Sequence, residues 1–136
     1  MWSNDCKIDQ FNLIEESMRS PELHAKYSQL LNDERKVLIA MIREFKRTKL
    51  EIRQFMINPS VNNPKGFLKK IPRSQRIIKS DYDTISDGDE TITQEEAKVS
   101  LQRAKVEYIE GILWQIKDRR GIIQNMIAVR RFESGE

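Results

Sequence analysis

The feature that most constrains this chain is a long run without helix breakers, because no glycine or proline occurs between Pro21 and Pro59. Serine suits the N-cap, proline the first helical position and glutamate the positive end of the helix dipole, so Ser20-Pro21-Glu22 predicts a helix start. The expected helix covers residues 21–57 and is about 55 Å long at 1.5 Å per residue. Its apolar residues recur at helical spacing in two neighbouring stripes, which are Leu23, Tyr27, Leu30, Val37, Met41 and Leu31, Leu38, Ile42, Phe45, Ile52, Met56.

A second long helix is predicted from Thr93 to a point between Phe132 and Gly135. Thr93 and Glu96 form a capping-box pattern at its start. The residues of its main apolar stripe are Val106, Ile109, Leu113, Ile116, Ile123 and Ile127. Gly111 and Gly121 interrupt the helix and indicate either tolerated weak points or a close approach by another helix. Before the first long helix, residues 8–18 also have helical spacing and predict a short packed helix.

Between the two helices, the sign of the charge changes abruptly. From residue 52 to residue 80 the chain has basic residues and no acidic one, and these are Arg53, Lys65, Lys69, Lys70, Arg73, Arg76 and Lys79. A loop of this kind predicts phosphate binding to nucleic acid, and Phe55 and Phe67 could add base stacking. The alternative is a solvated loop whose charges pair with the acidic run that follows.

That acidic run extends from Asp81 to Glu96 and contains the turn pattern Asp87-Gly88-Asp89. We interpret it as a solvated turn or as a mimic of DNA charge, since it lacks the twelve-residue spacing of a calcium loop. Residues 77–78 and 82–85 could form a short β-hairpin. The fold class is therefore mainly α, with two long helices joined by a charged loop in which this hairpin could form.

No catalytic or cofactor site is predicted. The single histidine, His24, has no partner for triad or metal chemistry, and Cys6 has no nucleophile context. A phosphate-binding glycine loop is absent from the sequence. We expect a protein that is not an enzyme and needs no cofactor or metal. No signal peptide or membrane-spanning run is visible, which predicts a soluble intracellular protein.

Both long helices have apolar faces wider than a two-helix hairpin can cover, which favours self-association into an oligomeric bundle or ring. A compact monomer with the N-terminal helix as third member is the alternative. The predicted organisation is a single domain, residues 1–136, with N-terminal helices in 1–57, the basic and acidic loop in 58–92 and an oligomerisation helix in 93–136. The stripe from Val106 to Ile127 is the predicted oligomer interface.

The C-terminal third carries a more specific pattern. Residues 111–119 read Gly-Ile-Leu-Trp-Gln-Ile-Lys-Asp-Arg, and residues 130–135 read Arg-Arg-Phe-Glu-Ser-Gly. This pattern, Gly-x-Leu-x-x-Ile-Lys-x-Arg followed by Arg-x-Phe-Glu-x-Gly, resembles the end of the UvsY-type recombination mediators of T-even-like phages. Chain length and the layout of two long helices around a loop are also similar.

The resemblance implies a ring-like homo-hexamer or homo-heptamer that acts in the cytoplasm of the infected bacterial host. It implies binding to single-stranded DNA, the phage recombinase and the phage single-strand-binding protein. The implied role is to load the recombinase onto covered DNA in recombination, repair and recombination-dependent replication.

In the family, DNA binding involves a basic and aromatic segment at the end of the first long helix, and residues 46–55 match it here. The sequence departs from the family at Glu51, where a basic residue is expected, and keeps only Phe55 as an aromatic. The predicted DNA-binding residues are Lys46, Arg47, Lys49, Arg53, Phe55, Lys65, Lys69, Lys70, Arg73 and Arg76. The alternative function is that of a helical adaptor or structural protein acting through protein–protein contacts. A regulator of duplex DNA is a third reading, but no helix-turn-helix pattern supports it.

Overall fold

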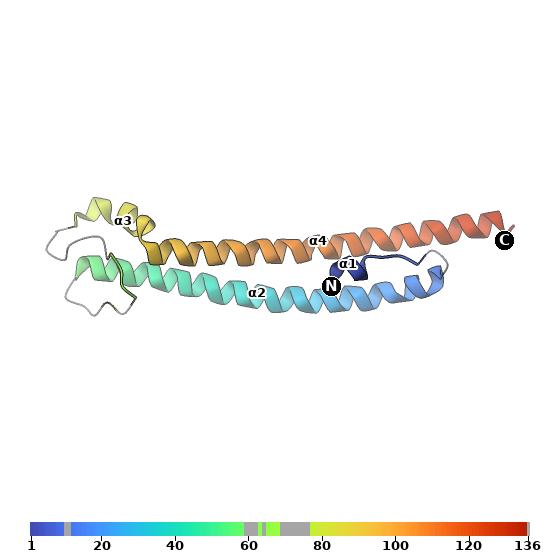
Figure 1. Cartoon of the computed structure of the whole chain (residues 1–136), viewed down its shortest axis with the longest axis horizontal. Helices are drawn as coiled ribbons and strands as arrows, with labels where there is room; N and C mark the ends of the chain where they lie inside the picture. Colours follow the sequence, from blue (N-terminus) through green and yellow to red (C-terminus); the bar gives the residue numbers. More distant parts are fainter. Residues whose placement is uncertain (10–11, 59–62, 64, 69–76, 136) are drawn as a thin grey trace. The chain divides into compact units, whose positions relative to one another are not determined.

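The computed structural model describes residues 1–9, 12–58, 63, 65–68 and 77–135. Its elements are four α-helices and one short 3₁₀ helix, namely α1 (Trp2–Asp5), α2 (Leu13–Ile57), the 3₁₀ helix Lys79–Asp81, α3 (Tyr82–Gly88) and α4 (Glu90–Glu133) (Figure 1). The described part of the chain contains no β-strand. The predicted mainly α class with two long helices is therefore confirmed.

The chain divides into two compact units. Unit 1 consists of Met1–Arg35 and Lys105–Glu136, and unit 2 consists of Lys36–Ala104. Each long helix contributes one segment to each unit.

The first long helix begins earlier than the sequence predicts, at Leu13, and continues through Pro21. The predicted boundary at Ser20 and the separate helix over residues 8–18 are therefore wrong. Proline inside a helix costs about 3 kcal/mol, so other contacts must hold the turns before it. The structure shows these contacts, because Leu13, Glu16 and Ser20 are buried and the Ser20 hydroxyl donates to the Glu16 carbonyl oxygen at 3.4 Å.

The second long helix also begins earlier, at Glu90 rather than Thr93. Asp89 precedes it, and its carboxylate accepts a hydrogen bond from the backbone N–H of Thr91 at 3.0 Å, as an N-cap side chain does. The Asp89 side chain therefore performs the capping that the sequence predicted for Thr93. The β-hairpin prediction is wrong for residues 82–85, which belong to α3.

In unit 1, the first part of α2 and the last part of α4 pack side by side in opposite chain directions (Figure 1). The core consists of Leu23 and Tyr27 from α2 with Ile112 and Ile116 from α4. Trp2 closes one side of this core, since its ring meets Tyr27 edge to face with centroids 5.3 Å apart. Its indole Nε1 also donates to Gln115 Oε1 at 2.9 Å, so α1 is held to both helices.

A polar network secures the N-terminal segment of unit 1. Arg119, only 4% exposed, forms an ion pair with the buried Glu16 and donates to the Lys7 carbonyl oxygen at 2.6 Å. Asp5 accepts hydrogen bonds from Lys26 Nζ at 2.6 Å and from the Tyr27 hydroxyl at 2.7 Å. These two bonds lower the pKa of the Asp5 carboxyl below its ordinary value. The network therefore joins α1, α2 and α4 through paired charges, although the buried Nε of Arg119 has no hydrogen-bond partner among the described residues.

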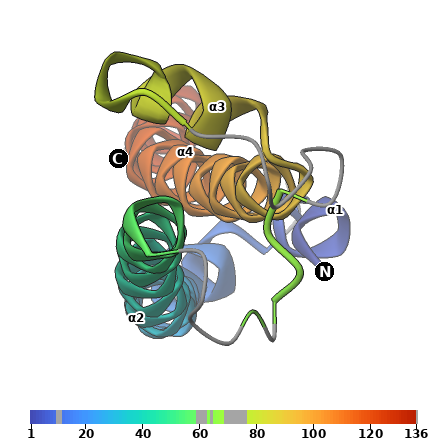
Figure 2. The same cartoon turned by 90° about the vertical axis from the view of Figure 1, so that its left-hand side faces the viewer.

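Unit 2 has its own core, formed by Ile52, Phe55, Met56, Phe67, Leu68 and Ile92. The segment from Lys65 to Leu68 reaches this core through two backbone positions with positive φ, Gly66 at 68° and Leu68 at 55°. Leu68 is an uncommon residue for that conformation. It is held there because its side chain is buried and its N–H donates to Asp89 Oδ1 at 2.9 Å. Figure 2 views this unit from its end, with α3 beside the first turns of α4.

The two glycines of α4 do not mark a close approach within the chain. A Cβ atom added at Gly111 or Gly121 would meet nothing within 4 Å. Packing among the described residues therefore does not require glycine at either position. Of the helices that the structure describes, none combines enough length and apolar character to cross a membrane.

Candidate nucleic-acid interface

One face of α2 in unit 2 presents three cations. Lys46, Lys49 and Arg53 are spaced by three and four residues, so they lie on the same side of the helix, and all three are exposed. None of them forms an ion pair with a described residue, although Lys49 Nζ lies 4.8 Å from the centre of the Phe45 ring. We call Lys46, Lys49 and Arg53 the basic face. Its charges are available to a polyanion.

The basic face forms one wall of a groove of about 290 Å³, and α3 contributes the other wall. Asp83 and Asp87, one helical turn apart, are exposed and line the α3 side. Neither forms an ion pair within the described residues. A phosphate in this groove is therefore attracted by α2 and repelled by α3.

Lys65 and Arg47 lie next to carboxylates. Lys65 Nζ is 3.2 Å from Glu44 and 3.1 Å from Glu51, and it donates to the Thr48 hydroxyl at 3.0 Å. Partial burial acts to lower the pKa of Lys65, but hydrogen bonds to Glu51 and Glu44 outweigh it and the pKa is raised. Arg47 is 3.5 Å from Glu44 and strongly exposed. Lys65 is therefore shared between the carboxylates of Glu51 and Glu44.

The aromatic residues predicted to stack on bases are buried. Phe55 and Phe67 belong to the core of unit 2, with ring centroids 6.5 Å apart. Both rings are packed in the interior of this unit and present little surface to solvent. Base stacking on Phe55 remains a prediction. The predicted DNA-binding residues Lys69, Lys70, Arg73 and Arg76 lie outside the described residues.

All six residues of the predicted oligomer interface lie in unit 1. Val106, Ile109, Ile116 and Ile123 are buried in the chain itself, and Leu113 and Ile127 are partly buried. Much of this stripe is therefore already used by packing within the chain, and its role between subunits remains a prediction.

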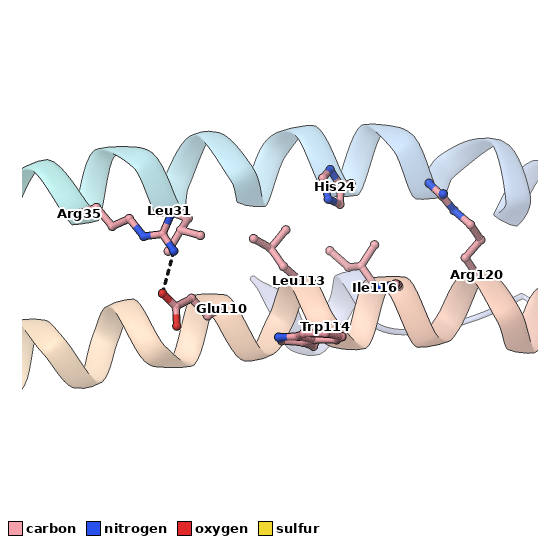
Figure 3. Close-up of a pocket in the computed structure, with 9 residues that line it drawn as sticks. His24, Leu31, Arg35, Glu110, Leu113, Trp114, Ile116 and Arg120 are labelled. Carbon is pink, nitrogen blue, oxygen red and sulfur yellow. Dashed lines mark hydrogen bonds and ion pairs between the residues drawn. The ribbon is translucent and has the colours of Figure 1, made fainter.

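Unit 1 contains a second groove, of about 660 Å³, that the sequence did not predict (Figure 3). Leu113 and Ile116 point from α4 toward α2, and Arg35 Nη2 bridges to Glu110 Oε1 at 2.8 Å. Trp114, on the α4 side, is 65% exposed. The signal in the sequence that could have pointed to this groove is a tryptophan, Trp114, followed closely by the cations Lys117 and Arg120. The wall on α2, with His24, Leu31 and Arg35, could not be inferred from spacing.

Neither groove contains a recognisable catalytic or metal centre. His24 is exposed and lies 3.4 Å from the Ser28 hydroxyl, with Nδ1 as the contacting atom. The part of the chain that the structure describes contains no group of three or more histidine, cysteine, aspartate or glutamate residues able to hold a metal ion.

Comparison with known proteins identifies one family. Residues 1–136 match the model of the family described as recombination, repair and ssDNA binding protein UvsY. Among curated proteins, none matches the sequence significantly.

The fold matches solved structures of one phage protein. Three crystal structures of the bacteriophage T4 recombination mediator protein UvsY, in lattice types IV, I and II, superpose with TM-scores of 0.79, 0.78 and 0.77. The sequence identities are 17%, 19% and 20%. The alignments cover 96%, 96% and 97% of this chain and 91%, 94% and 91% of the T4 chains. At these identities the likeness concerns the fold.

Proposed function

Because the chain belongs to the UvsY family of recombination, repair and single-stranded DNA-binding proteins, we propose that it is a phage recombination mediator. In this role it binds single-stranded DNA covered by the phage single-strand-binding protein and promotes loading of the phage recombinase. It acts in the cytoplasm of the infected bacterial host, as a homo-oligomer and without a catalytic step.

The observation that carries this proposal is the basic face of unit 2. Lys46, Lys49 and Arg53 are exposed, lie on one side of α2 and have no ion pair with a described residue. They fall within residues 46–55, the segment that matches the family's DNA-binding region. Such cations bind phosphates by releasing condensed counterions, which gives affinity that does not depend on base sequence.

Loading needs only a difference in binding free energy. A mediator that binds the recombinase-covered strand better than the strand covered by the other protein shifts the population toward the filament. Self-association strengthens a weak site, because each further contact of a bound oligomer with the same strand is intramolecular. Three cations per subunit are then sufficient for tight binding by several subunits.

We place the intersubunit contact on the exposed side of α4 in unit 1. Tyr108, Ile122 and Val129 are all exposed and are separated by multiples of seven residues, so they form one stripe along the helix. Burial of such a stripe by a second copy would remove its apolar surface from water.

Replacing Tyr108 and Ile122 with glutamate is expected to reduce the mass of the assembly to that of smaller species, as measured by light scattering. Each charge would have to be buried without a partner in the interface. The control replaces Gln124 and Ala128, which are exposed on the opposite side of α4, with glutamate and should keep the full mass. A double variant of Tyr108 and Ile122 that retained the full mass would contradict this interface.

The acidic wall of the groove should weaken DNA binding. Replacing Asp83 and Asp87 with asparagine is expected to raise the affinity for single-stranded DNA about three- to tenfold at low salt, because two repulsive charges near the phosphates are removed. The measurement is fluorescence anisotropy at 50 mM and 300 mM salt, where the gain should shrink. The matched control, Glu90→Gln with Glu96→Gln, removes two exposed charges of the same unit that do not line the groove. An equal gain in the control would contradict a local effect.

The test of the proposed function has two steps. Anisotropy with labelled single-stranded and duplex oligonucleotides across a salt series should show preference for single strands and a steep salt dependence. The recombinase and single-strand-binding protein of the same phage are then added, and the DNA-dependent ATPase of the recombinase should start sooner when the mediator is present. A chain that binds neither form of DNA would refute the proposal and favour a helical adaptor.

A further inference from the structure

The two tryptophans of the chain have opposite environments. Trp2 packs on Tyr27 and donates a hydrogen bond to Gln115. Trp114 is 65% exposed on α4, and Lys117 Nζ lies 5.0 Å from the centre of its ring. The packing of unit 1 therefore accounts for Trp2 and leaves Trp114 largely exposed, with the Lys117 ammonium over its ring.

The surroundings of Trp114 combine apolar and cationic groups. Leu31, Leu113 and Ile116 contribute apolar surface to the groove, and Arg35, Lys117 and Arg120 contribute three positive charges. Among the described residues that line the groove, Glu110 is the only carboxylate, and it is already paired with Arg35 at 2.8 Å. Lys117, over the Trp114 ring, and Arg120, farther along the same groove, form no ion pair with a described residue, so the groove holds two cations without a counter-charge among these residues.

We propose that this groove of unit 1 is a contact site for single-stranded DNA, in which a base stacks on Trp114 and Lys117 and Arg120 bind adjacent phosphates. Aromatic side chains stack on bases of any sequence, and flanking cations hold the backbone. Duplex DNA keeps its base faces covered by neighbouring pairs, so this site selects single strands. The inference rests on the proposed function and assigns to it a second site, separate in sequence from the basic face.

A helix from another protein could also cover Trp114, but it would leave Lys117 and Arg120 facing apolar surface unless it supplied two carboxylates. A single strand supplies the aromatic faces and the negative charges together. Charge complementarity therefore favours the nucleic acid, and the experiment below has an outcome that identifies the protein partner instead.

The first measurement uses Trp2→Phe, in which Trp114 is the only tryptophan. An oligothymidylate should quench its fluorescence, whereas an abasic oligonucleotide of equal length should bind, by anisotropy, with little quenching. Equal quenching by both, or none by the thymidylate, would overturn the proposal. If Trp2→Phe unfolds, the difference between wild type and Trp114→Phe gives the same information.

The second measurement compares Trp114→Phe with Trp114→Leu. Phenylalanine keeps a stacking face and should retain affinity to within about threefold, whereas leucine keeps apolar volume only and should weaken binding about five- to a hundredfold. The salt dependence should be unchanged in both. Lys117→Gln with Arg120→Gln should instead reduce the slope of log affinity against log salt by about 1.4.

Three outcomes separate the possible failures. If the variants Trp114→Phe and Trp114→Leu bind DNA with the same affinity and both form assemblies of lower mass, the groove is an interface between copies and the proposal is wrong. If wild type binds single strands and only a variant with glutamine at Lys46, Lys49 and Arg53 loses affinity, this inference fails while the proposed function stands. If wild type binds no single-stranded DNA, both are refuted.

Discussion

Replacing Lys46, Lys49 and Arg53 together with glutamine is expected to weaken binding of single-stranded DNA about a hundredfold at 0.1 M salt. Each cation that neutralises a phosphate contributes about 0.7 to the slope of log affinity against log salt on single strands. Removal of three such contacts should therefore flatten the slope by about two. The measurement is an anisotropy titration at four or more salt concentrations, with the mass of the assembly checked at each.

The control must separate local contact from net charge. Lys36, Lys98 and Arg103 are also exposed cations of unit 2, and they do not line the groove beside α3. Their replacement with glutamine removes the same total charge and should reduce affinity only slightly. If both triple variants lost affinity equally, the effect would come from overall charge and the basic face would not be the DNA contact.

Replacing Arg119 with methionine is expected to destabilise the folded state by about 3–5 kcal/mol, because the buried Glu16 carboxylate would lose its closest partner. The Lys7 carbonyl oxygen would also lose its closer donor and keep only Arg19 Nη1, at 3.5 Å. Because the free energy of unfolding falls linearly with urea concentration, this loss should lower the urea concentration at the unfolding midpoint by about 1–3 M. Circular dichroism during urea unfolding measures this, at one fixed protein concentration because association contributes to stability.

Two further variants test the origin of that loss. Arg120 is the exposed neighbour of Arg119, and Arg120→Met should change the free energy of unfolding by less than about 0.5 kcal/mol. Combining Arg119→Met with Glu16→Leu removes both charges and should recover part of the lost stability, since an apolar pair can replace a buried ion pair. A double variant as unstable as the sum of the two single ones would show that the charges act independently.

The N-terminal segment illustrates the limit of local sequence signals. Ser20, Pro21 and Glu22 form a good helix start, and the local chemistry of that prediction is sound. The structure extends the helix back to Leu13 because Arg119, about a hundred positions along the chain, pairs with Glu16. No local pattern contains that contact, so the boundary followed from tertiary packing.

The candidate site divides in the same way. The family resemblance pointed to Lys46, Lys49 and Arg53, and the structure shows that they line one groove together. Other features of the site depend on where distant segments pack. These are the carboxylates of α3 that line the groove, the ion pair between Lys65 and Glu51, and the burial of Phe55. The same holds for the groove beside Trp114, whose two walls come from residues far apart in the sequence.

The sequence by itself determined the helical class, the two long helices and the family, because these depend on periodicity, the absence of breakers and an ungapped C-terminal pattern. Only the tertiary structure decided where the helices begin, which apolar residues are buried within the chain and which charges remain without a partner. The physical reason is that helical periodicity is local, whereas burial and ion pairing depend on which side chains from distant parts of the chain come into contact.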